Sequence, residues 1–144
     1  MVQQMKKMRI AVVRSEFNWT ITGKMEEAAK RRARKKGVEV NEVLRVPGAF
    51  DMPLALSKAL KNKKTDAVVA LGAIVKGGTK HDETIAFALA KTVHELELQY
   101  GKPVGFGVMG PGVSWAQAQA RAKGYAERAV DAALALAAMQ NEKK

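Results

Sequence analysis

Short apolar runs alternate with longer helix-like segments along the whole chain. The runs are residues 10–13, 38–46, 67–74 and 104–109. The first is apolar throughout, which is typical of a strand buried on both faces, and 67–74 is the most strand-like run in the chain. The run 38–46 alternates and has one face less buried. Because strands that alternate with helices form parallel sheets covered by helices, this order predicts an α/β fold.

Helices are predicted between these strands and after the last of them, over about residues 21–36, 53–61, 81–100 and 115–139. Thr79 with Asp82, and Ser114 with Gln117, have the spacing of a capping box at the start of the last two helices. Gly124 is expected to kink the last helix or to split it in two.

We expect residues 1–144 to form a single domain, with residues 1–8 as a flexible or interface N-terminal arm. The length of 144 residues suits one domain, and a hydrophobic content of 47% argues against disorder. The chain has no cysteine, which excludes disulfides, zinc–thiolate and iron–sulphur sites and a thiol nucleophile. It has neither an apolar run long enough to span a membrane nor a signal-peptide core, so we expect a cytoplasmic protein.

The net charge is the one abnormal number in the composition. The 25 Lys and Arg against 14 Asp and Glu give a formal charge of +11 at pH 7, which raises the question of a nucleic-acid partner. Six of the basic residues lie in the run 30–36, at the end of the first helix, with no interleaved aromatic residues for base stacking. We interpret the run as a solvated helix end favoured by the helix dipole, and expect neither a nucleic-acid nor a membrane partner.

Right-handed crossovers place every loop that follows a strand at one edge of the sheet, where the carboxyl ends of the strands lie. The unusual side chains gather in these loops, which are residues 16–18, 47–51, 76–82 and 110–112. The connections at the opposite edge are ordinary polar turns. The sequence therefore predicts that the functional site lies at the carboxyl edge of the sheet.

The strongest local pattern is the glycine loop, residues 76–80, whose sequence Lys-Gly-Gly-Thr-Lys precedes His81. Its two glycines, the hydroxyl of Thr79 and the positive end of the following helix can cradle a small phosphate. Walker and dinucleotide-binding spacings are absent, and no cluster has metal-ligand spacing. An ordinary glycine-rich turn is the alternative, and His81 is either a proton carrier or a plain surface histidine.

Three other positions have both a chemical and a structural interpretation. Phe17, with Asn18 beside it, can stack on a planar ring or act as a hydrophobic staple for the first helix. Asp51 can accept hydrogen bonds from hydroxyls or cap the short helix. Arg121 is long enough to reach an anion, although most such arginines face solvent. His94 lies in mid-helix and is assigned no chemistry.

Together these segments resemble the lumazine synthase family. The matching motifs are Glu-Phe-Asn at 16–18, Val-Pro-Gly-Ala-Phe-Asp-Met-Pro at 46–53, Leu-Gly-Ala-Ile-Val-Lys-Gly-Gly-Thr-Lys-His-Asp at 71–82, and Lys-Pro-Val-Gly-Phe-Gly-Val at 102–108. They occur in the family's order and spacing, and residues 110–112 and 117–121 resemble its archaeal branch. The resemblance implies a three-layer α/β/α sandwich of the flavodoxin-like type, with a four-stranded, mostly parallel sheet.

The resemblance also implies a transferase-class enzyme of riboflavin biosynthesis. Such an enzyme condenses 5-amino-6-(D-ribitylamino)uracil with 3,4-dihydroxy-2-butanone 4-phosphate through imine formation, loss of phosphate and ring closure. The products are the lumazine, phosphate and water, and no metal or organic cofactor takes part. Family members form pentamers with active sites between adjacent subunits, and some form icosahedral shells, so a homo-oligomer is expected.

Individual roles follow from the resemblance. It implies catalytic roles for His81 and Arg121, and substrate-binding roles for Phe17, Asn18, Ala49, Phe50, Asp51, Ala73, Ile74, Val75, Lys76, Gly78, Thr79, Phe106 and Arg128. Phe106 and Arg121 would come from the neighbouring subunit. The family often has Glu in place of Asp51, which implies a shorter or water-bridged contact here. Arg128 is the nearest match to a family lysine, in a connection of different length.

Three alternatives stay open. An archaeal-type riboflavin synthase has the same fold, but the intact glycine loop argues against it. A nucleic-acid-binding module would follow from the charge of +11. A shell-forming scaffold, natural or engineered, would keep the fold without turnover.

Overall fold

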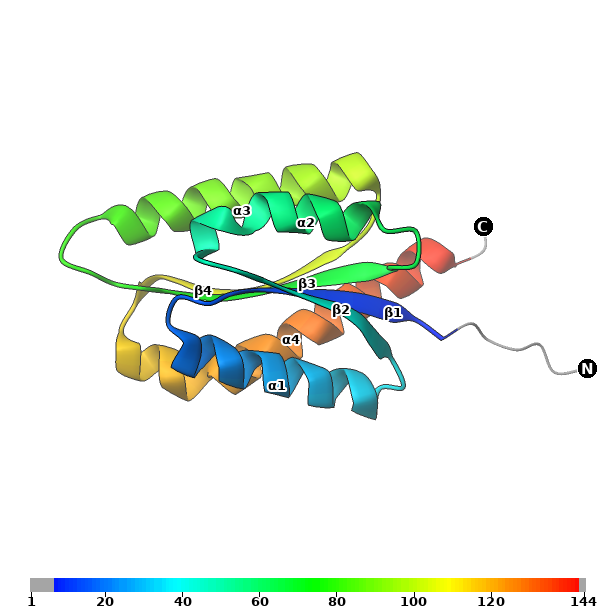
Figure 1. Cartoon of the computed structure of the whole chain (residues 1–144), viewed down its shortest axis with the longest axis horizontal. Helices are drawn as coiled ribbons and strands as arrows, with labels where there is room; N and C mark the ends of the chain where they lie inside the picture. The colour runs from blue at the N-terminus through cyan, green and yellow to red at the C-terminus, as the bar shows by residue number, and fades with distance from the viewer. Residues whose placement is uncertain (1–6, 143–144) are drawn as a thin grey trace, which may run out of the picture.

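The elements alternate in the predicted order, and the α/β prediction is confirmed. The computed structural model describes residues 7–142 (Figure 1). Its elements are β1 (Arg9–Ser15), α1 (Trp19–Lys35), β2 (Glu39–Val46), the short 3-10 helix η1 (Ala49–Asp51), α2 (Met52–Lys61), β3 (Ala67–Val75), α3 (His81–Tyr100), β4 (Val104–Val113) and α4 (Trp115–Asn141). Residues 1–6 of the expected N-terminal arm lie outside the described part of the chain.

The sheet has the order β2-β1-β3-β4, and all three strand pairings are parallel. β3 lies inside the sheet and is buried at every position except its last, as its unbroken apolar run predicts. β2 is an edge strand in which no residue is fully buried, so both of its faces, and not one alone, are only partly covered. Parallel pairing brings the carboxyl ends of all the strands to one edge, on the left of Figure 1.

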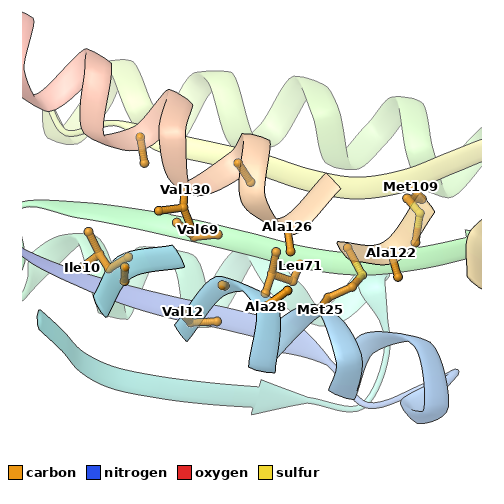
Figure 2. Close-up of a cluster of buried hydrophobic side chains, with 14 of the residues drawn as sticks. Ile10, Val12, Met25, Ala28, Val69, Leu71, Met109, Ala122, Ala126 and Val130 are labelled. Carbon is orange, nitrogen blue, oxygen red and sulfur yellow. The ribbon is translucent and has the colours of Figure 1, made fainter. Parts of the chain in front are cut away.

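Two helical layers cover the sheet. α1 and α4 lie on one face, and α2 and α3 lie on the other (Figure 1). The side chains that α1 and α4 bury against the sheet are seen in Figure 2, where Met25 and Ala28 of α1 face Leu71 of β3. The buried positions of α4 are alanines except for Val130, so this helix lies close to the strands beneath it.

β4 has glycines where α4 crosses it. A Cβ atom on Gly105 would overlap the carbonyl oxygen of Ala129, and one on Gly107 would meet the side chains of Ala129 and Leu71. These two positions therefore allow the close approach of α4. Their neighbour Phe106 points to the opposite face of the sheet, because successive side chains of a strand alternate.

The prediction of a loop at residues 110–112 is wrong, because β4 continues to Val113. The amide of Lys76 donates to the carbonyl of Val113 at 2.8 Å, and Val75 pairs with Val113. Glycines at 110 and 112 adopt φ values of 110° and 79°, so the strand continues with an irregular backbone. This tail of β4 packs beside the end of β3.

Of the two predictions for α4, the capping box at its start is confirmed and the split at Gly124 is not found. The capping box is confirmed, since the amide of Gln117 donates to Ser114 Oγ at 3.1 Å and the amide of Ser114 to Gln117 Oε1 at 3.0 Å. The helix then runs unbroken to Asn141, so Gly124 does not split it. Among residues 7–142, no helix has the length and apolar character needed to cross a membrane.

The basic run at the end of α1 is less free than predicted. The guanidinium of Arg32 donates two hydrogen bonds to Asp131 of α4, at 2.9 and 2.8 Å. Lys30 contacts Glu26 at 2.7 Å, and Lys36 lies 3.7 Å from Asp131. Half of the six charges therefore belong to ion pairs within the chain, and the interpretation as a wholly solvated helix end is corrected.

Glu26 is the centre of a second ion cluster, between α1 and the first two strands. Its side chain is only 4% exposed and contacts Arg14, Lys30 and Arg45 at 2.6–2.7 Å. Burial by itself would raise the pKa of Glu26, but hydrogen bonds from Arg45, Lys30 and Arg14 lower it to about 2. The cluster holds α1 against the two strands, whose carboxyl ends lead into the site.

Candidate functional site

A cavity of about 230 Å³ opens at the carboxyl edge of the sheet. Its lining comes from the ends of β1 and β3, from η1, and from the glycine loop with the first turns of α3. The lining residues are Ser15, Phe17, Asn18, Gly48, Ala49, Phe50, Ala73, Ile74, Val75, Gly77, Thr79, His81, Asp82 and Ile85. Nine of the predicted site residues therefore meet in one place: Phe17, Asn18, Ala49, Phe50, Ala73, Ile74, Val75, Thr79 and His81.

The first wall follows β1. The amide of Phe17 donates to the carbonyl of Pro47 at 2.9 Å, which ties the loops after β1 and β2 together. The ring itself is 71% exposed, so its face is available to stack on a planar group. Asn18 has φ 64°, a left-handed conformation that asparagine tolerates, and its Nδ2 donates to the carbonyl of Ala73 at 2.9 Å. The side-chain amide of Asn18 thus fixes the loop after β1 to β3.

The second wall is η1. Asp51 Oδ2 accepts a hydrogen bond from the amide of Gly48 at 3.0 Å, and the side chain makes no capping bond to α2. Asp51 also lies outside the cavity lining, so the structure places it as a brace of the η1 turn. The predicted cap of α2 is wrong at this position. Phe50, 64% exposed, lines the cavity from the same turn.

The glycine loop and the start of α3 form the third wall. Thr79 Oγ1 accepts a long hydrogen bond, 3.5 Å, from the amide of His81. The predicted capping box of Thr79 with Asp82 does not form, because Asp82 Oδ2 accepts instead from the amide of Gly112 at 3.0 Å. His81 is the first residue of α3, so its ring and the hydroxyl of Thr79 lie where the helix offers free amides to an anion.

Lys76 and Gly78 belong to the same loop but do not line the cavity. A Cβ atom on Gly78 would meet nothing within 4 Å, so this part of the loop faces open space. In Figure 1 the loop between β3 and α3 extends beyond the ends of the helices. Its amides are therefore accessible to a ligand that enters the cavity from outside.

The remaining predicted residues lie elsewhere on the same chain. Phe106 is on β4, at the free edge of the sheet, and is 39% exposed. Arg121 and Arg128 are both exposed on α4, and the Arg128 guanidinium lies 5.0 Å from the ring of Tyr125. Because Arg121, Tyr125 and Arg128 are spaced by four and three residues, their side chains lie on one flank of α4. None of the three predicted residues reaches the chain's own cavity.

Of the other five lining residues, Gly77 belongs to the predicted phosphate cradle, and sequence reasoning missed Ser15, Gly48, Asp82 and Ile85. Ser15 ends a strand at the carboxyl edge, a position that could have identified it, and its side chain is buried. Asp82 had been assigned a local capping role, while its actual partner is 30 residues away. Within residues 7–142, no group of three or more His, Asp or Glu side chains could hold a metal ion.

Comparisons with known proteins show the family of the chain. The family model described as 6,7-dimethyl-8-ribityllumazine synthase matches residues 7–144. A protein of that name from Aeropyrum pernix is 48% identical over 137 residues, covering 94% of this chain and 93% of its own. Others of the same name are from Staphylothermus marinus, 48% identical over 86% of this chain and 83% of its own, and from Archaeoglobus fulgidus, 46% identical over 92% of each.

Proposed function

The chain belongs to the 6,7-dimethyl-8-ribityllumazine synthase family, and we propose that it condenses 5-amino-6-(D-ribitylamino)uracil with 3,4-dihydroxy-2-butanone 4-phosphate. The observation that carries this proposal is the cavity at the carboxyl edge. It combines an exposed aromatic ring, Phe17, with a histidine and a threonine hydroxyl at a helix N-terminus, His81 and Thr79. A heterocycle and a phosphate ester need these two kinds of surface at one site.

Each part of the cavity suits one part of the substrates. We assign the pyrimidine ring to the face of Phe17, and the ribityl chain to the η1 wall at Ala49 and Phe50. Gly78 and Thr79, with the free amides of α3, would hold the phosphate. Asp51 Oδ2 already accepts a hydrogen bond from the amide of Gly48. A ribityl hydroxyl that donates directly to Asp51 would therefore bind a carboxylate that also holds the η1 turn.

We propose that the family's reaction takes place between these residues. The amine of the uracil attacks the ketone of the butanone, and water leaves as the imine forms. His81 then moves protons while the C–O bond to phosphate breaks, and the amide donors stabilise the departing charge. Loss of phosphate leaves an enol, which tautomerises to a ketone at the former carbinol carbon. The second amine closes the ring on this new carbonyl, and a second water is lost. Much of the acceleration would come from holding two flexible, polar reactants in reacting geometry.

A neighbouring subunit would complete the site. Phe106, Arg121 and Arg128 lie at the free edge of β4 and on α4, away from the chain's own cavity but open to a second copy. Phe106 of one chain would then cover the ring bound by the next, and Arg121 would grip the phosphate through two hydrogen bonds. We propose a homo-oligomer, a pentamer or an icosahedral shell of pentamers, that works in the cytoplasm.

The test is to mix the protein with both substrates and follow lumazine formation by absorbance. We expect product from the parent protein and about a hundredfold slower turnover after His81→Ala, the usual range for loss of a general acid–base group. His94→Ala is the matched control, since His94 lies on the same helix with 78% of its side chain exposed. It should leave turnover unchanged.

Arg121→Ala separates the phosphate role from chemistry. A lost charge-assisted hydrogen bond predicts a KM for the butanone phosphate raised about tenfold or more, with the KM for the uracil substrate little changed. No product from the parent at high enzyme concentration would overturn the enzyme assignment and favour a scaffold. Equal slowing by the His81 and His94 variants would overturn the role of His81.

A further inference from the structure

Asp82 is a buried carboxylate beside the reactive end of the cavity that the proposed chemistry does not use. It lies in the first turn of α3, directly after His81, and only 8% of it is exposed. Its Oδ2 accepts a hydrogen bond of 3.0 Å from the amide of Gly112, in the tail of β4. The carboxylate therefore joins the start of α3 to a strand 30 residues further along the chain.

The other hydrogen bonds at the start of α3 are local and long. The amide of His81 reaches Thr79 Oγ1 at 3.5 Å, and the amide and hydroxyl of Thr84 reach the carbonyl of Lys80 at 3.3 and 3.5 Å. Such bonds bend the chain within one turn, but they do not fix that turn relative to the sheet. Asp82 makes a short bond that does.

The partner of Asp82 is itself held in place. Val113, next to Gly112, accepts a 2.8 Å hydrogen bond from the amide of Lys76 and pairs with Val75. The tail of β4 is therefore part of the sheet up to its last residue. Since Lys76 begins the glycine loop, the loop is anchored to this tail at its first residue and again, through Asp82, just after its end.

We propose that Asp82 is a positioning residue for the reaction proposed above: by holding the amide of Gly112, its carboxylate fixes the first turn of α3, and with it His81 and Thr79, relative to the ring-binding wall. The inference rests on the proposed function. A fixed first turn matters because displacements of about 1 Å at a reacting group cost up to about a hundredfold in rate. Asp82 does this through the position of its oxygen rather than through its charge.

Three substitutions at this position separate position from charge. Asp82→Asn keeps an oxygen in the same place to accept from Gly112 and removes the charge. Asp82→Glu keeps the charge and displaces the oxygen by one methylene, and Asp82→Ala removes both. We expect kcat/KM close to the parent for Asn and about ten- to a hundredfold lower for Glu and Ala. Glu83→Gln, an exposed neighbour, is the control and should match the parent.

Two readouts distinguish positioning from a general loss of structure. Inorganic phosphate, used as a competitive inhibitor, should have a higher inhibition constant with the Glu and Ala variants, because the anion site is displaced. Hydrogen exchange at the amides of Gly112 and Val113 should accelerate in the Ala variant and stay near the parent rate in the Asn variant. All assays are made well below the unfolding temperature of each variant.

The outcomes decide the matter. If Asn is as slow as Ala, or Glu is faster than Asn, the role belongs to the charge and the proposal is overturned; the Asn–Glu comparison holds even if the Ala variant does not fold. Turnover of the Ala variant equal to that of the parent also overturns it. In each case product from the parent leaves the proposed function standing, whereas an inactive parent would count against the function itself.

Discussion

Replacing Glu26 by glutamine tests how α1 is held onto the first two strands. The carboxylate is 4% exposed and is shared by Arg14, Lys30 and Arg45, so its pKa is lowered from 4.5 to about 2 despite its burial. A group with a lowered pKa stabilises the fold above its unfolded pKa, and that stability is lost as the pH falls toward the folded pKa.

The magnitude follows from the two pKa values. The difference between 4.5 and about 2 corresponds to about 3 kcal/mol of stability at neutral pH. Glutamine resembles the protonated acid, so Glu26→Gln should lower the free energy of unfolding by about 3 kcal/mol at pH 7. By linkage, the gap between parent and variant should shrink to about half at pH 3, between the two pKa values.

Urea unfolding at a series of pH values measures this gap. Parent and variant are compared at one protein concentration, since association adds to apparent stability. Glu95→Gln, an exposed position on α3, is the control and should shift the curve by less than about 0.5 kcal/mol at every pH. Parallel curves for parent and Glu26→Gln between pH 7 and pH 3 would refute the argument, because a structural effect of glutamine alone would not depend on pH.

Two further changes test the packing of α4. Gly105→Ala places a Cβ against the carbonyl of Ala129 and should destabilise the fold by about 1–3 kcal/mol in urea unfolding. Gly23→Ala, in open space within α1, should instead stabilise the fold by up to about 1 kcal/mol. The opposite order of stabilities would contradict the close approach of α4 to β4. The hydrogen bond from Arg32 lowers the pKa of Asp131. Because the Asp131 side chain is 37% exposed, Asp131→Asn should lower the free energy of unfolding by less than about 1 kcal/mol. In thermal unfolding, high salt should reduce the difference in stability between the parent and this variant.

The elements of this fold were predictable because the local pattern of apolar and polar residues indicates which faces of a strand or helix are buried. The apolar run at 67–74 and the alternating run at 38–46 indicated strands, and the structure has β3 and β2 there; the places of these strands inside the sheet and at its edge come from the structure. The handedness of crossovers then placed the loops after the strands at one edge without any knowledge of side-chain contacts. This is why residues as far apart as Phe17 and His81 could be assigned to one site, and why the cavity includes both.

The errors share a physical cause, which is competition from a partner that local pattern does not show. Gly-Pro-Gly at 110–112 has the composition of a turn, yet the end of β3 offers hydrogen bonds that extend the strand. Asp82 has capping-box spacing, yet the amide of Gly112 is its partner. Arg32 looked like a solvated charge until α4 brought Asp131 to it, 99 residues along the chain.

The residues of β4 show how one short segment serves both the fold and the proposed site. Gly105 and Gly107 face α4 and let it approach, so the alternation of the strand obliges Phe106 to face the other side. β4 is also the edge strand of the sheet, so no further strand covers Phe106, which is 39% exposed. A chain that buries α4 so closely must therefore present this ring outward. The packing that completes the monomer thus leaves part of an aromatic side chain exposed where a second copy could use it. Substitution of Phe106 by alanine should slow lumazine formation, and in urea unfolding it should cost less than the roughly 3–5 kcal/mol typical of a fully buried phenylalanine.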